Sequence, residues 1–304
     1  MYTKEQIQKE LDELKLKYGE WNFDIPLPFD VWTKGNLGVP QTRLRKIVQI
    51  VNDLSQKPIS KSRILDLGCS DGMFSIEFAL HGAETVGVEA REANIKKAIF
   101  SKEVLNLKNL EFRQDDIRKI NVASYGKFDA IVCSGVFYHL PAIDAINLIK
   151  TMYDMVNRLI VLDVRVALEP IEKVVHNKDE YWGTIFREHP ENATPEEKEK
   201  RLFYSIDNMT SFWFTRPSLI NLLSKVGFSS IYECFTPAHM NFGKPGIHHL
   251  DHLTFVALKG EICELKTSPD ANSLRENFPE GSLTYAPEKP GSLYKRALSK
   301  LKER

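Results

Sequence analysis

Short apolar runs alternate with longer segments of helical periodicity through the middle of the chain. Residues 73–81 and 92–106, for example, space their apolar positions as on one face of a helix. The runs that predict strands are RILDLGC (63–69), ETVGVEA (84–90), LEFRQDD (110–116), FDAIVCSG (128–135) and RLIVLDVRV (158–166). Strands that alternate with helices predict a parallel sheet with helices on both faces.

The first 60 residues predict a helical extension in front of this sheet. Thr3 and Gln6 form a capping-box pattern at the start of an amphipathic helix over residues 3–18, and a second helix is expected over 42–54. Residues 21–40 are rich in Pro, Gly and aromatic side chains, so they cannot form one regular element.

Residues 168–212 interrupt the alternation. They are mostly polar and predict one capped helix, which begins after Thr194. An insertion of this length late in an α/β domain either covers a site or packs on the edge of the sheet. The pattern resumes with a helix over 216–228 and two strands, over 229–235 and 251–260.

Composition narrows the class of protein. The 304 residues contain 41 Lys and Arg and 41 Asp and Glu, so a uniformly basic protein that coats nucleic acid is excluded. No uncharged apolar run approaches the roughly 18 residues of a membrane-spanning helix, and the charged start lacks the apolar core of a signal peptide. Four distant cysteines without a CxxC pair argue against a zinc ribbon and a disulfide scaffold, so we expect a cytoplasmic protein.

The loop after the first strand carries the sharpest chemical signal. It reads Asp66-Leu67-Gly68-Cys69-Ser70-Asp71-Gly72, and its glycines allow a tight turn and the close approach of a ligand. No Lys follows to hold phosphates, so this is not a P-loop. The aspartate can instead receive an ammonium or hydroxyl groups.

Carboxylates end the next two strands. Glu89 lies about 20 residues after Gly68, where a carboxylate can accept both hydroxyls of a ribose. Asp116 ends the third strand, where it can accept an adenine amine while Ile117 packs on the ring; Asp115 is the alternative for this role. A nucleoside ligand along this edge of the sheet is therefore predicted.

The segments ILDLGCSDG, VGVEA, FRQDDI and FDAIVCSGVFYHL, in this order, resemble the class I S-adenosylmethionine-dependent methyltransferases. The resemblance covers roughly residues 63–165 and continues more weakly to 260. It implies an α/β, Rossmann-like doubly wound sheet, mostly parallel with an antiparallel late strand. Residues 1–60 are then the N-terminal extension, 61–260 the methyltransferase domain and 261–304 a C-terminal extension. The cofactor residues that it implies are Asp66, Gly68, Gly72, Glu89, Asp116, Ile117 and, beside the transfer centre, Ser134.

A closer resemblance is to wobble-uridine tRNA methyltransferase-like proteins, through WTKG, GVFYHL and WFTRPSLINLLSKVGF. In that group a Lys and a Tyr help to bind a carboxylated cofactor, and Lys34 and Tyr138 match them. The late strand that supplies an Arg there reads HHLDHLTFVALKG here. This loss favours ordinary S-adenosylmethionine as the cofactor, and Lys34 is carried over only as a cofactor-binding position.

Three further groups of residues are candidates for the acceptor side. His139 is either a general base or a packing residue at the entry of a helix, and Tyr138 lines the transfer site. Trp213 and Arg216 form either part of the core or a pocket wall with a contact for an anionic group. His249 belongs to a cluster of His248, Asp251 and His252, which a strand would divide between its two faces. We therefore expect a substrate-facing or solvated role for His249 and no metal site.

These observations predict methyl transfer from S-adenosylmethionine to an oxygen or nitrogen of a small molecule or saccharide. The alternative is methyl or carboxymethyl transfer to the wobble uridine of a tRNA. Residues 289–304 carry six Lys and Arg against one Glu, which predicts either a solvated terminal helix or contact with RNA or an anionic membrane surface. The sequence leaves the oligomeric state open.

Overall fold

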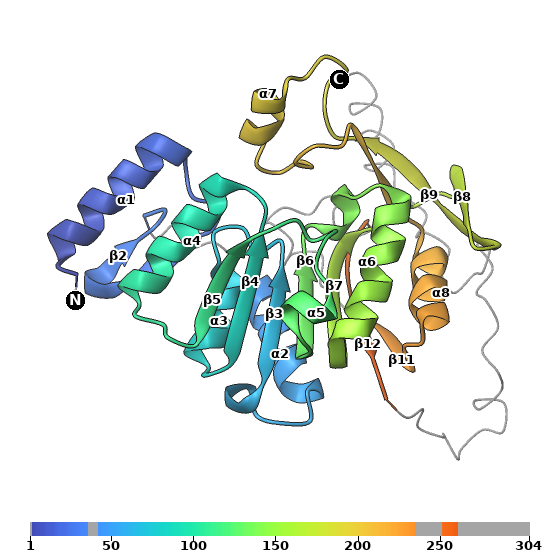
Figure 1. Cartoon of the computed structure of the whole chain (residues 1–304), viewed down its shortest axis with the longest axis horizontal. Helices are drawn as coiled ribbons and strands as arrows, with labels where there is room; N and C mark the ends of the chain where they lie inside the picture. The colour runs from blue at the N-terminus through green and yellow to red at the C-terminus, as the bar shows by residue number, and fades with distance from the viewer. Residues whose placement is uncertain (1, 36–41, 235–250, 261–304) are drawn as a thin grey trace, which may run out of the picture.

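A seven-stranded sheet forms the centre of the molecule (Figure 1), in a computed structural model that describes residues 2–35, 42–234 and 251–260. The strand order is β11-β12-β7-β6-β3-β4-β5. The strands are β3 (Arg63–Leu67), β4 (Glu84–Glu89), β5 (Leu110–Gln114), β6 (Phe128–Ser134), β7 (Val156–Arg165), β11 (Ser230–Cys234) and β12 (His252–Leu258). Only β12 runs against its neighbours, β7 and β11. The prediction of a mostly parallel sheet with an antiparallel late strand is confirmed.

Helices cover both faces of this sheet because its strands are apolar on both sides. Ala130 and Val132 of β6 pack toward α2 (Thr42–Leu54) and α3 (Met73–Leu80). Their neighbours Ile131 and Cys133 point to the opposite face, toward α6 (Ala142–Met155) and α8 (Arg216–Val226). The period of two in a strand thus divides each apolar run between two cores. The remaining helices of the sheet domain are α4 (Glu92–Val104), α5 (Val122–Tyr125), η2 (Ile59–Lys61) and η3 (Phe137–His139).

The N-terminal extension packs beside the β5 edge of the sheet. Helix α1 (Lys4–Tyr18) begins with the predicted capping box of Thr3 and Gln6, and Ile7 and Leu11 share a core with Phe100 of α4. A short hairpin follows, with β1 (Pro26–Leu27) and β2 (Val31–Trp32) on either side of η1 (Pro28–Asp30).

The domain boundaries at 60 and 260 stay predictions. Among the described residues, no helix combines the length and apolarity of a membrane span.

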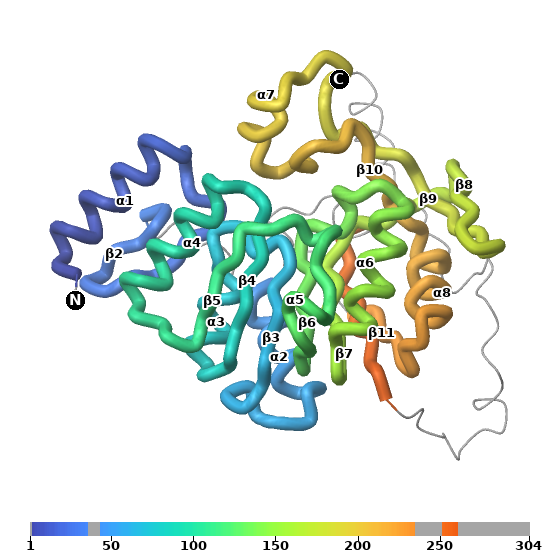
Figure 2. The backbone as a smooth tube through the Cα atoms, in the orientation of Figure 1, coloured from blue at the N-terminus to red at the C-terminus, as the bar shows by residue number. Residues whose placement is uncertain are grey.

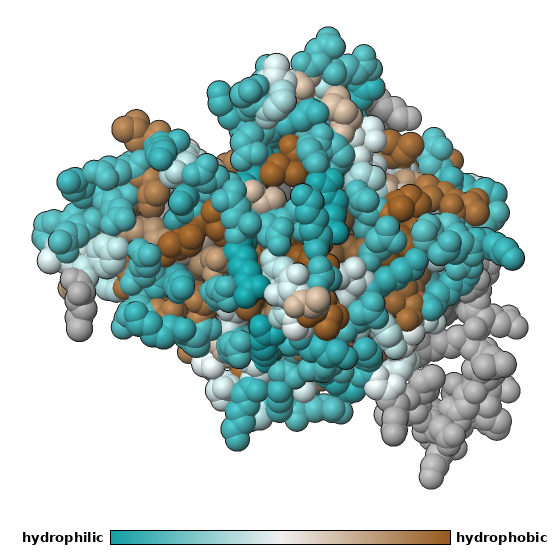
Figure 3. Space-filling model, in the orientation of Figure 1, coloured by the Kyte–Doolittle hydropathy of each residue, from teal (hydrophilic) through white to brown (hydrophobic). Residues whose placement is uncertain are grey.

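The insertion differs from the prediction, which gave it a single helix. It holds α7 (Pro195–Lys200) as expected, but also β8 (Glu172–His176), β9 (Asp179–Arg187) and β10 (Thr210–Phe214) in an antiparallel sheet. Ile171, Val175 and Ile185 are exposed, and apolar side chains gather over β8 and β9 in Figure 3. A half-buried strand is normally recognised by alternating apolar and polar residues. Apolar residues on the solvent side remove this alternation.

The segment between β9 and β10 rises above one edge of the large sheet (Figure 2). This is the edge at which β3, β4, β5 and β6 end, as the contacts of Arg91, directly after β4, with residues 198–205 establish. The carboxyl ends of parallel strands are where α/β proteins bind ligands. The insertion therefore lies over the expected ligand edge.

Candidate active site

The loop after β3 is a tight turn built on two glycines. Gly68 has φ +67°, and a Cβ there would lie 2.7 Å from the side chain of Val136. Gly72 has φ +93°, and its Cβ would lie 2.7 Å from Phe112. A side chain at either position would meet both backbone strain and a clash, so the loop requires glycine at both.

Two buried carboxylates face this loop. Asp66, at the end of β3, accepts a hydrogen bond from Ser75 Oγ at 2.6 Å, and burial raises its pKa to about 7. Glu89, at the end of β4, accepts from the backbone N–H of Ser70 at 3.0 Å and of Arg91 at 2.8 Å. Burial raises the pKa of Glu89 as well. Burial thus disfavours the charged form of both carboxylates. A positively charged ligand beside them would stabilise that charged form.

Asp71, the second aspartate of the loop, is fully buried. Its Oδ2 accepts from the backbone N–H of Asn22 at 2.6 Å and of Phe23 at 2.9 Å. Asn22 Nδ2 also donates to Ser70 Oγ at 2.6 Å. The N-terminal extension is thus fastened directly to the glycine loop.

The two aspartates after β5 have different partners. Asp115 accepts from Tyr125 Oη at 2.7 Å and from the backbone N–H of Asp116 at 2.7 Å, which ties it into its own turn. Asp116 is partly exposed and forms a bidentate pair with Arg118, and the pair lowers the pKa of Asp116 although burial opposes it. Ile117 is buried in the core. Asp115 therefore has a structural role in the turn, and the contact of Asp116 with an adenine amine stays a prediction.

A buried polar network continues along the same edge on β6, β7 and β12. Ser134, Asp163 and Thr254 are register partners on these strands, so their side chains lie in one row. Arg43 of α2 donates to Ser134 Oγ at 2.7 Å and pairs with Asp163, and Thr254 Oγ1 donates to Asp163 at 2.6 Å. Burial alone would raise the pKa of Asp163, but Arg43 and the hydrogen bonds hold it far below its usual range.

Tyr138 lies among aromatic rings and charges beside this network. Its ring centroid is 6.0 Å from that of Trp213 and 6.2 Å from that of His252, whose Nε2 is 3.2 Å from Asp163 Oδ2. Trp213 stacks on Phe186 with centroids 4.7 Å apart. The structure thus brings the predicted residues Tyr138 and Trp213 together. Trp213 lies on β10.

His139 is held by a carboxylate from the insertion. Its Nδ1 lies 2.9 and 3.0 Å from the two oxygens of Glu188, which is completely buried. Burial would raise the pKa of Glu188, but the hydrogen bonds from His139 and Ser211 lower it. Within residues 2–35, 42–234 and 251–260, Nε2 of His139 has no hydrogen-bond partner. A carboxylate on Nδ1 fixes the tautomer in which Nε2 can accept a proton.

The remaining predicted residues are placed as follows. Lys34 contacts Asn22, with Nζ 3.5 Å from its carbonyl oxygen, and Asn22 in turn contacts Ser70 of the glycine loop. Arg216, the first residue of α8, faces Glu233 with 3.7 Å between charged atoms. His249 lies outside the described residues, as does the tail over 289–304. Across the part of the chain that is described, no group of three His, Cys, Asp or Glu side chains could hold a metal.

Sequence reasoning missed three residues of the site: Arg43, Asp163 and Glu188. Asp163 left a signal, because it is a charged residue within the apolar run RLIVLDVRV and buried charges are nearly always paired. Glu188 left none, since it follows a strand that the sequence did not reveal.

A family model described as a methyltransferase domain matches residues 59–207. The O-antigen chain terminator bifunctional methyltransferase/kinase WbdD of Escherichia coli is 28% identical over 152 residues, 49% of this chain and 20% of that protein. The ubiquinone biosynthesis O-methyltransferase of Acinetobacter baumannii (strain AYE) is 24% identical over 98 residues, 32% of this chain and 40% of that enzyme. The chain therefore spans less than half the length of both relatives.

Among solved structures, the chain is similar to the N-terminal domain of EvdMO1, crystallised with S-adenosylhomocysteine (SAH) and D-fucose. The TM-score is 0.61 at 22% identity, over 85% of this chain and 96% of that domain. At this identity the likeness concerns the fold, and it agrees with the strand order described above. The predicted class I methyltransferase fold is confirmed, whereas the closer grouping with wobble-uridine tRNA enzymes is not.

Proposed function

We propose, from the premise that residues 59–207 form an S-adenosylmethionine-dependent methyltransferase domain, that this chain methylates a hydroxyl oxygen of a saccharide. The observation that carries the proposal is the His139–Glu188 pair at the turn after β6. A hydroxyl acceptor must lose its proton when its oxygen is methylated. A histidine oriented by a buried carboxylate is suited to take that proton near neutral pH.

The residues along the strand ends fit S-adenosylmethionine. The ligand carries a sulfonium and an ammonium, and the buried Asp66 and Glu89, whose pKa values are raised, would be stabilised by positive charge. Asp66 and the glycine loop would hold the methionine portion, Glu89 the ribose hydroxyls and Asp116 the adenine amine. When bound, this cofactor supplies a methyl group on a positively charged sulfur.

The chain's own contribution is orientation and one proton transfer. With the cofactor bound, the acceptor oxygen would form a bond to the methyl carbon while the carbon–sulfur bond breaks and its electron pair stays on sulfur. The hydroxyl proton moves to Nε2 of His139, while Glu188 stabilises the resulting imidazolium through Nδ1–H. Holding the acceptor in line with the breaking bond under the insertion supplies much of the rate.

A saccharide acceptor has two supports. WbdD is described by its name as acting on O-antigen, and the EvdMO1 domain was crystallised with D-fucose. In this chain, Phe186, Trp213 and Tyr138 offer aromatic surface beside polar groups such as the Asp163–His252 pair. Apolar ring faces with a few placed polar groups suit a sugar, which presents both C–H faces and hydroxyls. The tRNA alternative gains no support, because none of the relatives named above is a tRNA enzyme.

Cofactor affinity should depend on pH near neutrality. Asp66 faces Ser75, Glu89 and Arg43, and with a pKa of about 7 it is protonated below that pH in the empty site. A cationic ligand prefers the carboxylate, so we expect the dissociation constant of S-adenosylmethionine to increase as pH falls below 7, approaching about tenfold per pH unit, and to level off above 7.

Titration calorimetry from pH 5.5 to 8 measures this dependence. The Asp66→Asn variant is the control, and its affinity should be weaker and should change less with pH across the same range. An equal pH dependence of the dissociation constant in both proteins would show that Asp66 does not contact the cofactor.

The acceptor class can be tested by incubating the protein with methyl-labelled S-adenosylmethionine and a panel of monosaccharides, nucleotide sugars and lipopolysaccharide fragments, with total tRNA as a separate arm. We expect label in a saccharide as an alkali-stable methyl ether, and none in tRNA. Label in tRNA, or in a nitrogen of any acceptor, would refute the proposal.

A further inference from the structure

Arg91 fastens the insertion beside the predicted ribose site. It lies two residues after Glu89, its side chain is 4% exposed, and its own N–H donates to Glu89. Its guanidinium donates to the backbone carbonyl oxygens of Lys198 (3.1 Å), Glu199 (2.5 Å), Arg201 (3.2 Å), Tyr204 (2.9 Å) and Ser205 (3.0 Å). A single side chain thus organises the backbone of the segment that contains α7.

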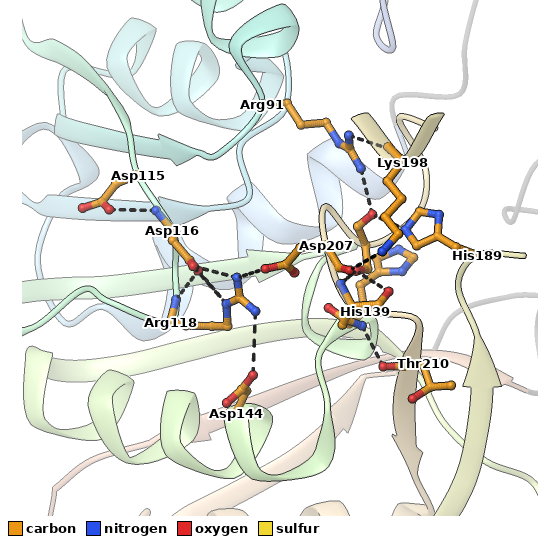
Figure 4. A network of polar contacts seen from close by, with 12 residues as sticks. Arg91, Asp115, Asp116, Arg118, His139, Asp144, His189, Lys198, Asp207 and Thr210 are labelled. Atoms are coloured by element: carbon orange, nitrogen blue, oxygen red, sulfur yellow. Dashed lines mark hydrogen bonds and ion pairs between the residues drawn. The ribbon is translucent and has the colours of Figure 1, made fainter. Parts of the chain in front are cut away.

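Arg118 also holds the insertion, beside the predicted adenine site. It lies two residues after Asp116 and forms with it the bidentate pair described above. Its Nη2 also donates to Asp207 of the insertion at 2.6 Å, and Figure 4 shows the guanidinium between Asp116, Asp144 and Asp207. Each carboxylate expected to bind the nucleoside is therefore followed, two residues later, by an arginine that holds the insertion.

The segment that the arginines hold is the one that orients His139. The backbone N–H of Ser205 donates to Glu188 Oε2 at 2.9 Å, and Arg201 donates to the carbonyl oxygen of Glu188 at 2.8 Å. Asn208, next to Asp207, donates to the carbonyl oxygen of His139 at 3.1 Å. The chain of contacts from Glu89 and Asp116 to the imidazole is unbroken.

We propose that Arg91 and Arg118 are positioning residues that couple occupation of the cofactor site to the orientation of His139; this inference rests on the proposed function. Ribose and adenine bound at Glu89 and Asp116 would fix the two strand ends from which the arginines project. The arginines would fix residues 198–208, and these hold Glu188 against Nδ1. Because coupling is reciprocal, loosening the insertion should also weaken cofactor binding.

The test uses Asp207→Asn in the full chain, because Asp207 is half exposed and its loss leaves the Asp116–Arg118 pair intact. Glu191→Gln is the matched control: it removes an exposed ion pair with Arg187 in the same insertion that touches neither arginine. We expect Asp207→Asn to lower kcat and to raise the dissociation constant of SAH, each by about fivefold or more. Glu191→Gln should change neither.

The second readout is the titration of His139, followed by NMR of 13C-labelled histidine with and without SAH and assigned through His139→Ala. The groups facing this imidazole are Glu188 and Tyr138, with Arg201 behind Glu188. We expect SAH to shift the midpoint in the wild-type protein and to shift it less in Asp207→Asn and Arg118→Gln. Arg118→Lys, which keeps the charge but not the bidentate fork, should restore part of the response.

An equal response to SAH in wild type, Asp207→Asn and Arg118→Gln would overturn the coupling, whatever the rates. The proposed function fails on a different result. If His139→Ala retains full transferase activity while the SAH response of His139 still depends on Asp207, the coupling holds and His139 is not the base.

Discussion

Replacing His139 with Ala lowers kcat for methyl transfer by about 10²–10⁴-fold, the usual contribution of a general base. The dissociation constant of S-adenosylmethionine stays within about twofold of wild type, because the imidazole is paired with Glu188 and not with a predicted cofactor contact. Single-turnover rates and calorimetry measure the two quantities separately.

Two further variants sharpen this prediction. Glu188→Gln keeps the shape of the side chain but not its charge, so the imidazolium loses its stabilising partner and kcat should lie between wild type and His139→Ala. His81→Ala removes an exposed histidine at the C-terminal end of α3, whose side chain pairs with Glu77, and it should leave kcat unchanged. A His139→Ala enzyme with wild-type kcat would mean that the imidazole serves only packing.

The second large effect is on the cofactor. Replacing Glu89 with Gln should raise the dissociation constant of S-adenosylmethionine by about 100-fold or more. Two hydrogen bonds from ribose hydroxyls to a carboxylate contribute about 1.5–3 kcal/mol each, and about 2.7 kcal/mol corresponds to 100-fold. Gln retains an oxygen that can accept from Ser70 or Arg91, so the glycine loop should persist.

Glu111→Gln is the control for this variant. Glu111 lies on the neighbouring strand β5, is exposed and pairs with Arg113 at 2.7 Å. It should bind the cofactor like wild type, and circular dichroism should be unchanged in both variants. Wild-type affinity in a folded Glu89→Gln protein would rule out the ribose contact.

The sheet could be predicted from sequence because most of its strands are apolar runs between polar turns, a signal that depends only on local residues. The glycine loop could also be predicted from local residues, because the glycines directly follow an apolar run. The structure explains why glycine is needed: Gly68 has a positive φ, and a side chain there would clash. The carboxylates at the strand ends followed from the resemblance, and the structure adds that Asp115 is committed to Tyr125.

The partners that activate or hold these groups lie far away in sequence, so local patterns could not reveal them. Glu188 meets His139 across 49 residues, and Arg43 meets Ser134 across 91. The small sheet of the insertion was missed because Val175 and Ile185 face solvent, which breaks the alternation that a strand normally displays. Contacts of this kind depend on tertiary packing, so the identities of the two residues alone do not predict them.

The position of β12 sets the order in which the molecule can be completed during synthesis. This strand lies between β7 and β11 but comes after both in the chain. Until residues 252–258 leave the ribosome, β7 therefore has an open apolar edge and Asp163 lacks His252 and Thr254. Nascent chains arrested before this strand should thus depend on chaperones, whereas those arrested well beyond residue 260 should not, because strand insertion closes the edge and completes the hydrogen bonds of the buried Asp163 together.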